Sequence, residues 1–180
     1  MTDFASATEL KTWLELSTVN EDKANLALSV ASSEIRSHCG WSISEETATL
    51  VLDGPGSRNL WLPTLKLTAV TSVKVNGDPL ALDSQYDWTG YGKLIHRGCW
   101  PSKPRSVEVV FTHGYAEVPA VVKGVCLASA GRAYDNARAV RSKTDTAGPF
   151  TESTTYAVTT GGLTSDETKK LGPFMIEHLG

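Results

Sequence analysis

Histidine and cysteine are the side chains here that could bind a transition metal. His38 and Cys39 are adjacent, and His96 and Cys99 have the spacing H-x2-C. A structural zinc site takes four ligands, usually from paired Cys or His motifs. The second pair lacks a partner with matching spacing, so we interpret these residues as ordinary helix-end and hairpin residues. We expect no metal and no cofactor.

Motifs for nucleophilic catalysis and nucleotide hydrolysis are missing from the sequence. It contains no G-x-S-x-G elbow and no G-x-x-x-x-G-K-[ST] loop. His113 precedes Gly114 at a strand–helix junction, where a turn residue is favoured over a general base. The segment Asp53–Gly56 is a loop with no helix after it, so it does not form a phosphate site. The sequence therefore predicts no enzyme; a small metal-dependent hydrolase is an alternative that metal analysis would test.

Four aromatic residues gather in the middle of the chain and allow a second function. Trp61, Trp88, Tyr91 and Trp100 could stack on sugars or bases, or fill the core of a small sheet. We favour the core for Trp61 and Trp88. Tyr91 and Trp100 adjoin glycine or proline turns, and we expect them to be exposed and available to an interface. A carbohydrate- or ligand-binding module remains an alternative if these rings line one open groove.

Composition limits the classes of protein to which the chain can belong. It has 180 residues and a formal net charge of −3. The acidic balance argues against a protein that binds nucleic acid by neutralising phosphates. Three cysteines and no basic, apolar leader indicate reduced thiols and no secretory signal. No run approaches the roughly 20 apolar residues of a membrane span, so we expect no membrane partner.

The N-terminal part of the chain is typical of two helices. A capping box from Ser6 to Glu9 starts a helix over residues 7–16. Asn20 is a good N-cap for a second helix over residues 21–39. Small and aliphatic residues at helical spacing form its buried stripe, which Leu26 and Val30 widen.

Strands, a long helix and a polar segment follow. Short apolar runs between turns predict an inserted antiparallel β region over about 48–112, with a hairpin turn at Asn76–Gly77. A helix is predicted over 119–140, with small residues that allow another helix to approach closely. Residues 141–163 are expected to be a flexible loop or arm, and 164–180 a capping-box helix and apolar tail. We predict one α+β domain over 1–140, mostly a helical bundle with the β insertion.

Seven segments in these elements together carry a family resemblance: Thr8–Leu14, Asn20–Asp22 leading into Ala31–Ile35, Phe111–Tyr115, Val118–Val122, Thr164–Glu167 and Leu171–Phe174. With these segments, the order of elements resembles the head–tail connector proteins of tailed bacteriophages, also called head completion or adaptor proteins. The β insertion departs from the barest, mostly helical members, but longer members carry such a segment.

The resemblance implies a structural protein of the virion neck, assembled in the bacterial host cytoplasm. It implies a ring of identical subunits, expected to number twelve, below the portal protein, through which double-stranded DNA passes without sequence-specific binding. The ring would receive a stopper or tail-completion protein. In this family the C-terminal segment commonly reaches the portal, which nominates as portal-binding residues Leu171, Pro173, Phe174, Met175 and Ile176.

A closed ring also needs two different patches on each subunit. The second helix and the small-residue long helix could supply lateral contacts. The residues that we nominate for the subunit interface are Arg132, Arg138, Arg141, Tyr91 and Trp100. Another neck component, such as a stopper or tail terminator, is a closer alternative, but the opening helices and the long helix favour the adaptor.

Overall fold

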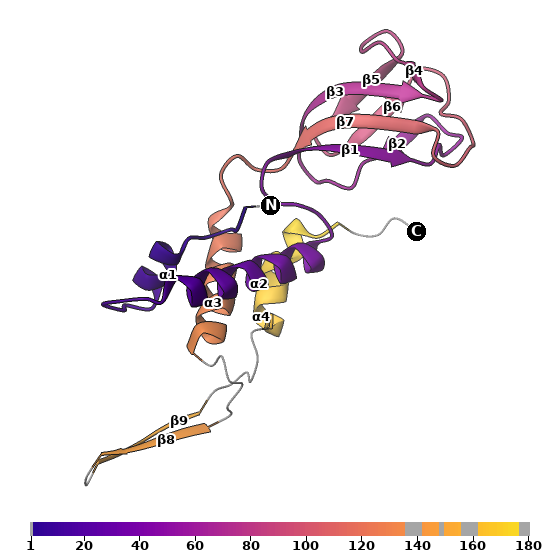
Figure 1. Ribbon diagram of the computed structural model, residues 1–180. Coiled ribbons are helices and arrows are strands. Elements are labelled where there is room, and N and C mark those ends of the chain that lie inside the picture. The colour runs from indigo at the N-terminus through magenta and orange to yellow at the C-terminus, as the bar shows by residue number, and fades with distance from the viewer. Residues whose placement is uncertain (1, 136–141, 148–149, 156–161, 177–180) are drawn as a thin grey trace. The chain divides into compact units, whose positions relative to one another are not determined.

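A computed structural model describes residues 2–135, 142–147, 150–155 and 162–176 (Figure 1). None of the helices in these ranges is long and apolar enough to cross a membrane. The elements in chain order are α1 Ala7–Trp13, α2 Glu21–Cys39, β1 Glu46–Leu52, β2 Asn59–Trp61, β3 Leu67–Val75, β4 Asp78–Pro79, β5 Tyr86–Thr89, β6 Lys93–His96, β7 Val107–His113, α3 Ala120–Asp135, β8 Ser142–Ala147, β9 Phe150–Thr155, α4 Ser165–Leu171 and the short 3-10 helix η1 Gly172–Phe174.

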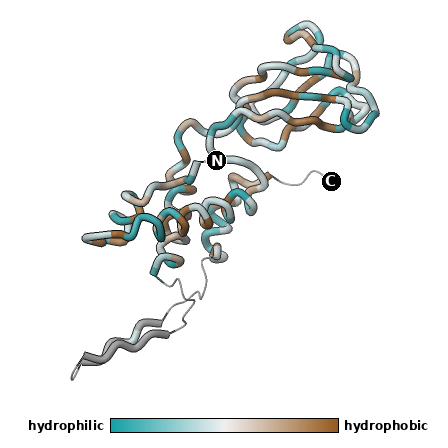
Figure 2. Tube along the Cα trace, in the orientation of Figure 1, coloured by the Kyte–Doolittle hydropathy of each residue, from teal (hydrophilic) through white to brown (hydrophobic). Residues whose placement is uncertain are grey.

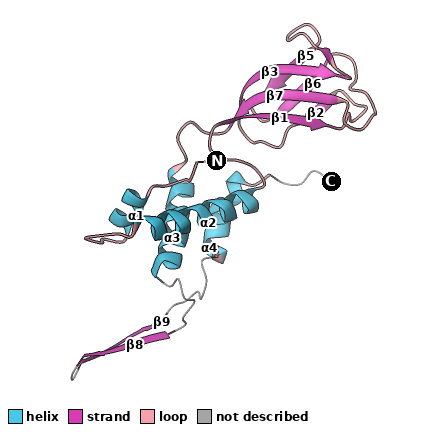
Figure 3. Ribbon diagram, viewed as in Figure 1, coloured by secondary structure: helices cyan, strands magenta, loops and turns pink. Residues whose placement is uncertain are grey.

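The chain divides into two compact units, coloured by secondary structure in Figure 3. The helical unit comprises Met1–His38 and Pro119–Pro173. The β unit comprises Cys39–Val118 and Phe174–Gly180. The main segment of the β unit is therefore inserted between the two segments of the helical unit. The C-terminal segment from Phe174 also belongs to the β unit.

Two antiparallel sheets build the β unit. One has the strand order β1-β7-β3-β4, and the other has the order β2-β6-β5. Burial alternates strictly along β7, as expected where one face of a strand meets a core. Figure 2 shows hydrophobic and hydrophilic positions mixed along the strands of this unit. Ten buried side chains from both sheets form one hydrophobic core, which includes Trp100 and Phe111.

The hairpin between β3 and β4 confirms a sequence prediction. Val75 pairs with Asp78, so Asn76 and Gly77 form a two-residue loop. Both residues have positive φ, +53° and +96°, as the tight turn of a twisted hairpin requires. Glycine adopts this backbone without strain, and asparagine tolerates it better than most residues.

Small and aliphatic side chains meet in the interior of the helical unit, where α2 packs against α3. Ala24, Ala31 and Ile35 of α2 are buried, as are Val122 and Cys126 of α3. The Ser32 hydroxyl lies 3.5 Å from the Cys126 thiol, which places these two helix faces in contact. Figure 1 shows α2 crossing α3 in this unit.

Helices α1 and α4 each have only seven residues, too few to be stable in isolation. Both begin with the capping boxes that the sequence predicts. The Ser6 hydroxyl accepts from the Glu9 N–H, and Thr164 does the same for Glu167. Each glutamate in return accepts from the backbone N–H of its N-cap residue.

The prediction of a mostly helical bundle is wrong. The β unit has two sheets and a core of its own, whereas two of the four helices in the described ranges have only seven residues. An α+β description fits in part. Each apolar run is short in the sequence, and the extent of the sheets depends on the pairing of β1, β7 and β3, which joins runs that are distant in sequence.

Element bounds also differ from those expected. Helix α1 ends at Trp13 rather than residue 16, and Glu15 has a φ of +54°. Helix α3 is described to Asp135, and residues 136–140 of the predicted helix lie outside the described residues. Within 141–163, predicted as a loop or arm, β8 and β9 pair as an antiparallel hairpin.

Candidate functional site

Of the histidine and cysteine candidates, His96 and Cys39 occupy structural positions, whereas Cys99 is exposed. His96 Nδ1 accepts a hydrogen bond of 2.9 Å from the Gly98 N–H, and its ring packs 5.0 Å from that of Trp100. Cys39 is buried, and this burial raises the pKa of its thiol to about 11. A thiol with such a pKa is a poor nucleophile and metal ligand at neutral pH. Among the described residues, no three His, Cys, Asp or Glu side chains gather as a metal site would require.

His113 is part of the aromatic interior of the β unit. Its ring lies 4.9 Å from that of Phe111 and 6.3 Å from that of Trp41. Burial lowers the pKa of His113, and the Glu46 carboxylate 3.6 Å away only partly opposes this effect. The expectation of a turn residue is therefore wrong in detail: His113 ends β7 and is a buried packing residue.

The four aromatic residues do not line one open groove. Trp100 is only 1% exposed, and its Nε1 donates to the Arg58 carbonyl oxygen at 3.0 Å. The expectation that Trp100 is exposed is therefore wrong, and it is withdrawn as an interface residue. Trp61, expected in the core, is 49% exposed, and Tyr91 is 77% exposed as expected. Pro101 next to Trp100 indicates a turn at the surface, but the Trp100 side chain itself belongs to the core of the β unit.

Arg132 has a partner within its own subunit. Its two terminal nitrogens each donate at 2.7 Å to one oxygen of Glu167, and Nη2 also donates to the Gly162 carbonyl. Burial would raise the pKa of Glu167, but the bonds from Arg132 and Thr164 lower it below its usual value. The carboxylate that caps α4 therefore also joins α4 to α3.

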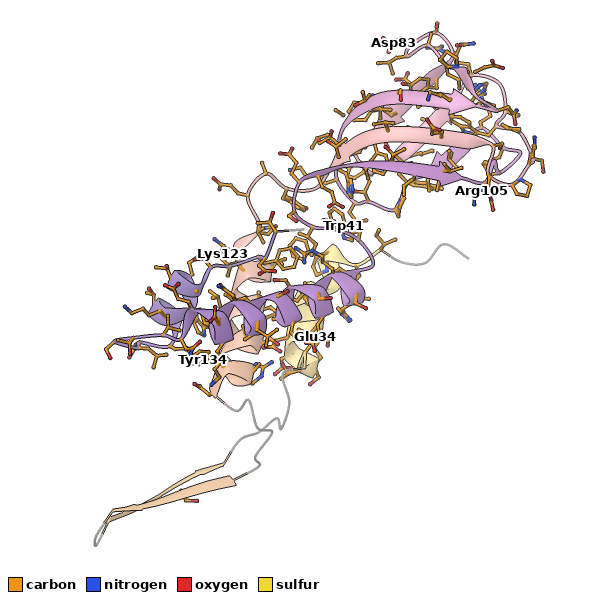
Figure 4. The ribbon with its side chains drawn as sticks, in the orientation of Figure 1. Glu34, Trp41, Asp83, Arg105, Lys123 and Tyr134 are labelled. Atoms are coloured by element: carbon orange, nitrogen blue, oxygen red, sulfur yellow. The ribbon has the colours of Figure 1, made fainter. Side chains whose placement is uncertain are left out.

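Glu34 of α2 borders this ion pair and has the opposite electrostatic balance. Its Oε2 atom is buried without a hydrogen-bond partner among the described residues. Burial raises the pKa of Glu34, and the charge on Glu167 adds to this effect while Arg132 opposes it. Figure 4 labels Glu34 on α2 and, at the other end of the unit, Lys123 on α3. Lys123 Nζ donates to Glu9 of α1 at 2.8 Å. The other nominated arginines, Arg138 and Arg141, lie outside the described residues.

The nominated tail residues are divided between the two units. Leu171 ends α4 and is fully buried in the helical unit. Phe174 and Ile176 belong to the β unit, where the Trp41 Nε1 donates to the Phe174 carbonyl at 2.7 Å and the Ile176 N–H donates to the Cys39 carbonyl at 3.0 Å. Pro173 and Met175 are exposed. This part of the tail is therefore anchored to its own chain.

Sequence analysis missed a hollow on the helical unit, here called the α3 groove. It has a volume of about 300 Å³ and is mostly apolar. Trp13 of α1 forms one wall, 53% exposed. A second hollow of about 490 Å³ lies along α1 and shares Trp13. The lining of the α3 groove is completed by Ala120, Val121, Gly124, Val125 and Ala128 of α3 and Glu167 and Lys170 of α4.

Two aliphatic residues of α2 are exposed on the helical unit. Leu26 is 67% exposed and Val30 is 45% exposed. The interpretation that they widen the buried stripe of α2 is therefore wrong. They lie four residues apart on one helix face, which also exposes Asn25, Ser29 and Ser33. We call this face the α2 ridge. The sequence does contain a signal for this exposed face, because α2 has more apolar positions than one buried face needs.

The comparisons with known proteins agree with this architecture. The family model described as "HCP: Head completion protein" matches residues 3–130. No curated protein is similar enough to count as a match.

Two similar solved structures come from gene transfer agent (GTA) particles. A chain in the virion of a native GTA particle has a TM-score of 0.67 and 17% identity, with 98% of this chain and 92% of that chain covered. A chain in the neck of a native GTA particle, computed with C12 symmetry, has a TM-score of 0.57 and 16% identity, with 99% and 97% covered. At these identities the likeness shows a shared fold. The family match spans well over half of the sequence, so the chain belongs to the head completion protein family.

Proposed function

We propose that this chain is the adaptor of a phage-type head–tail joint, forming a ring below the portal protein and extending the DNA channel. The observation that carries the proposal is the family match over residues 3–130, which includes α1, α2, β1 to β7 and most of α3. As a head completion protein, the chain is a structural component of the virion neck, where head and tail are joined. The stopper or tail-completion protein would bind the far side of the ring.

A twelve-membered ring is the symmetry that we propose. The similar GTA chain belongs to a neck computed with C12 symmetry, and nearly all of this chain takes part in that likeness. Double-stranded DNA would pass through the lumen without sequence-specific binding. A formal net charge of −3 suits such a conduit, because walls that bind phosphates tightly would slow the passage of DNA.

We propose the C-terminal tail as the portal-docking segment. Pro173 and Met175 are exposed and would contact the portal directly. Phe174 and Ile176 would present them, since both are held by hydrogen bonds to the β unit. Leu171 would act from inside the helical unit by fixing the end of α4.

For the subunit interface we retain the proposal for Tyr91, Arg138 and Arg141. Arg132 would contribute indirectly, because its guanidinium is already bound to Glu167. We further propose that the chain catalyses no reaction, consistent with a family of structural proteins. A ligand-binding module is not favoured, since burial of Trp100 removes one wall of the groove that it needs.

Cryo-electron microscopy and native mass spectrometry of the full chain with its cognate portal protein would test the proposal. We expect a closed ring of this chain on the tail-facing side of the portal, and free protein that binds the portal without nucleotide or metal. Failure of the chain to bind the portal would reject the adaptor assignment.

A further inference from the structure

We propose that neighbouring subunits of the ring contact each other through the helical unit, with the α2 ridge of one subunit seated in the α3 groove of the next. The occupant of the groove is thus a second copy of this chain. This inference rests on the proposed ring and adds the two surfaces that would close it. A ring needs a heterologous contact, made by two different patches of one subunit.

The two patches lie on opposite sides of the helical unit. Successive residues of an α-helix are about 100° apart. On α2, Leu26 and Val30 are therefore roughly opposite Ala24, Ala31 and Ile35, which are buried.

The same reasoning applies to α3. Cys126 faces α2, as its contact with Ser32 shows. Val121, Gly124 and Ala128 lie on a face roughly opposite that contact and line the groove. Patches on opposite sides allow each subunit to bind two neighbours at once.

Shape suits a helix as the occupant. The groove runs along α3 from Ala120 to Ala128, and the ridge with its acidic end runs from Asp22 to Val30. Each stretch contains nine residues, and the eight steps between its ends span about 12 Å of helix. An added Cβ at Gly124 would meet no atom within 4 Å, so the groove is open at that point. Small residues of this kind let a second helix approach closely, ridge into groove.

Charge also suits the pairing. Glu21 and Asp22 are exposed at the N-terminal end of the ridge, and from Asn25 to Ser33 its exposed residues carry no charge. Lys170 is exposed at the groove, whose apolar lining faces the uncharged section. Seating the aliphatic residues would place the two acidic side chains where Lys170 can attract them, giving the contact a direction as well as an apolar centre.

Cysteine cross-linking within the portal-bound assembly tests the contact directly. The variant carries Leu26→Cys and Val121→Cys in a Cys99→Ser background, where Cys39 and Cys126 remain buried. A short bismaleimide should produce a ladder of covalent oligomers up to the ring size. Each single-cysteine variant serves as a control. It should give no covalent oligomers, because one cysteine per subunit cannot cross-link a head-to-tail contact.

A second variant tests the same contact without a cross-linking reagent, by placing a larger side chain in the groove. Gly124→Leu fills the groove while leaving the fold intact, since the site is open and leucine is a better helix former than glycine. We expect an unchanged or higher Tm and loss of the ring. Adding Leu26→Ala should partly restore assembly by shortening the residue that the new leucine blocks. As a matched pair, Leu26→Glu should abolish ring formation, and Leu82→Glu, at another exposed leucine (44% against 67% for Leu26) in the β unit, should not.

The outcomes separate this inference from the proposed function. A portal-bound ring that gives no ladder, or that forms equally well with Gly124→Leu, would overturn the contact and leave the adaptor assignment standing. Dimers from a single-cysteine variant would also overturn it, because they report a two-fold contact. Absence of any ring on the portal would overturn both.

Discussion

The two units of this protein are stabilised in different ways. The β unit encloses a core of large side chains, including Trp100, Phe111 and Leu94. The helical unit has an interior that combines alanines with larger side chains such as Phe4 and Leu28, and ion pairs join its short helices to α3: Glu9 with Lys123 for α1, and Glu167 with Arg132 for α4. Area buried by large apolar groups is the main stabilising contribution in most folds. In the helical unit the ion pairs therefore supplement apolar burial by attaching α1 and α4 to α3, and the exposed aliphatic residues of α2 leave apolar surface for a partner.

The largest effect should come from the β core. Trp100→Ala removes a ring that is 1% exposed and should destabilise the β unit by about 3–5 kcal/mol. Trp61→Ala, at a half-exposed ring, should cost only about 0.5 kcal/mol. Urea unfolding with hydrogen exchange read separately over each unit checks both. Equal losses for the two variants would remove the distinction between core and surface tryptophans.

The second-largest loss of stability should come from a change at the end of α4. Leu171→Ala empties a fully buried site in the helical unit and should cost about 2–5 kcal/mol. Met175→Ala, at an exposed position, should leave stability almost unchanged and weaken portal binding instead. Thermal unfolding and portal pull-down measure the two effects. Truncation from Leu171 onward should thus destabilise the helical unit as well as remove the residues that we propose for portal docking.

Ion pairs of the helical unit give a smaller effect. Arg132→Met leaves the buried Glu167 carboxylate without its bidentate partner and should cost about 1.5–3 kcal/mol. Lys123→Met breaks a pair whose side chains are both about two-fifths exposed, and should cost less than about 1 kcal/mol. Chemical denaturation of both variants provides the comparison. Loss of exchange protection confined to α4 and α3 in Arg132→Met would confirm where the pair acts.

The smallest effect is a dependence of stability on pH, to which Glu167 and Glu34 contribute with opposite signs. Glu167 has a lowered pKa, so its stabilising contribution is present above its unfolded pKa and is lost as pH falls through the folded value. Glu34 has a raised pKa, so its ionised form destabilises the fold, fully at pH above that raised value, and this cost disappears in acid. Glu34→Gln should therefore raise the Tm slightly at pH 7 and leave it unchanged near pH 4. A lower Tm at pH 7 would contradict the unfavourable burial of this charge.

Local signals predicted local structure well. Both capping boxes and the Asn76–Gly77 hairpin are where the sequence indicates, because each depends on side chains that bond to the backbone within a few residues. The family resemblance also proved correct. These features need no knowledge of which distant segments meet.

Features that depend on distant segments were harder to predict. Trp100 is buried because the two sheets enclose it, and nothing beside it in the sequence indicates this. Leu26 and Val30 fit helical periodicity, but only the position of α3 shows which face of α2 is covered. Arg132 finds Glu167 across 35 residues of sequence. The α3 groove is likewise formed by three helices that are far apart in the chain.

Glu167 has a consequence for the order in which the chain folds. The same carboxylate closes the N-terminus of α4 and binds Arg132, so helix initiation and docking share one group. A helix of seven residues does not persist before docking. During synthesis α3 leaves the ribosome before α4. The helical unit is therefore completed only after α4 has emerged, and until then the α3 groove lacks one of its walls.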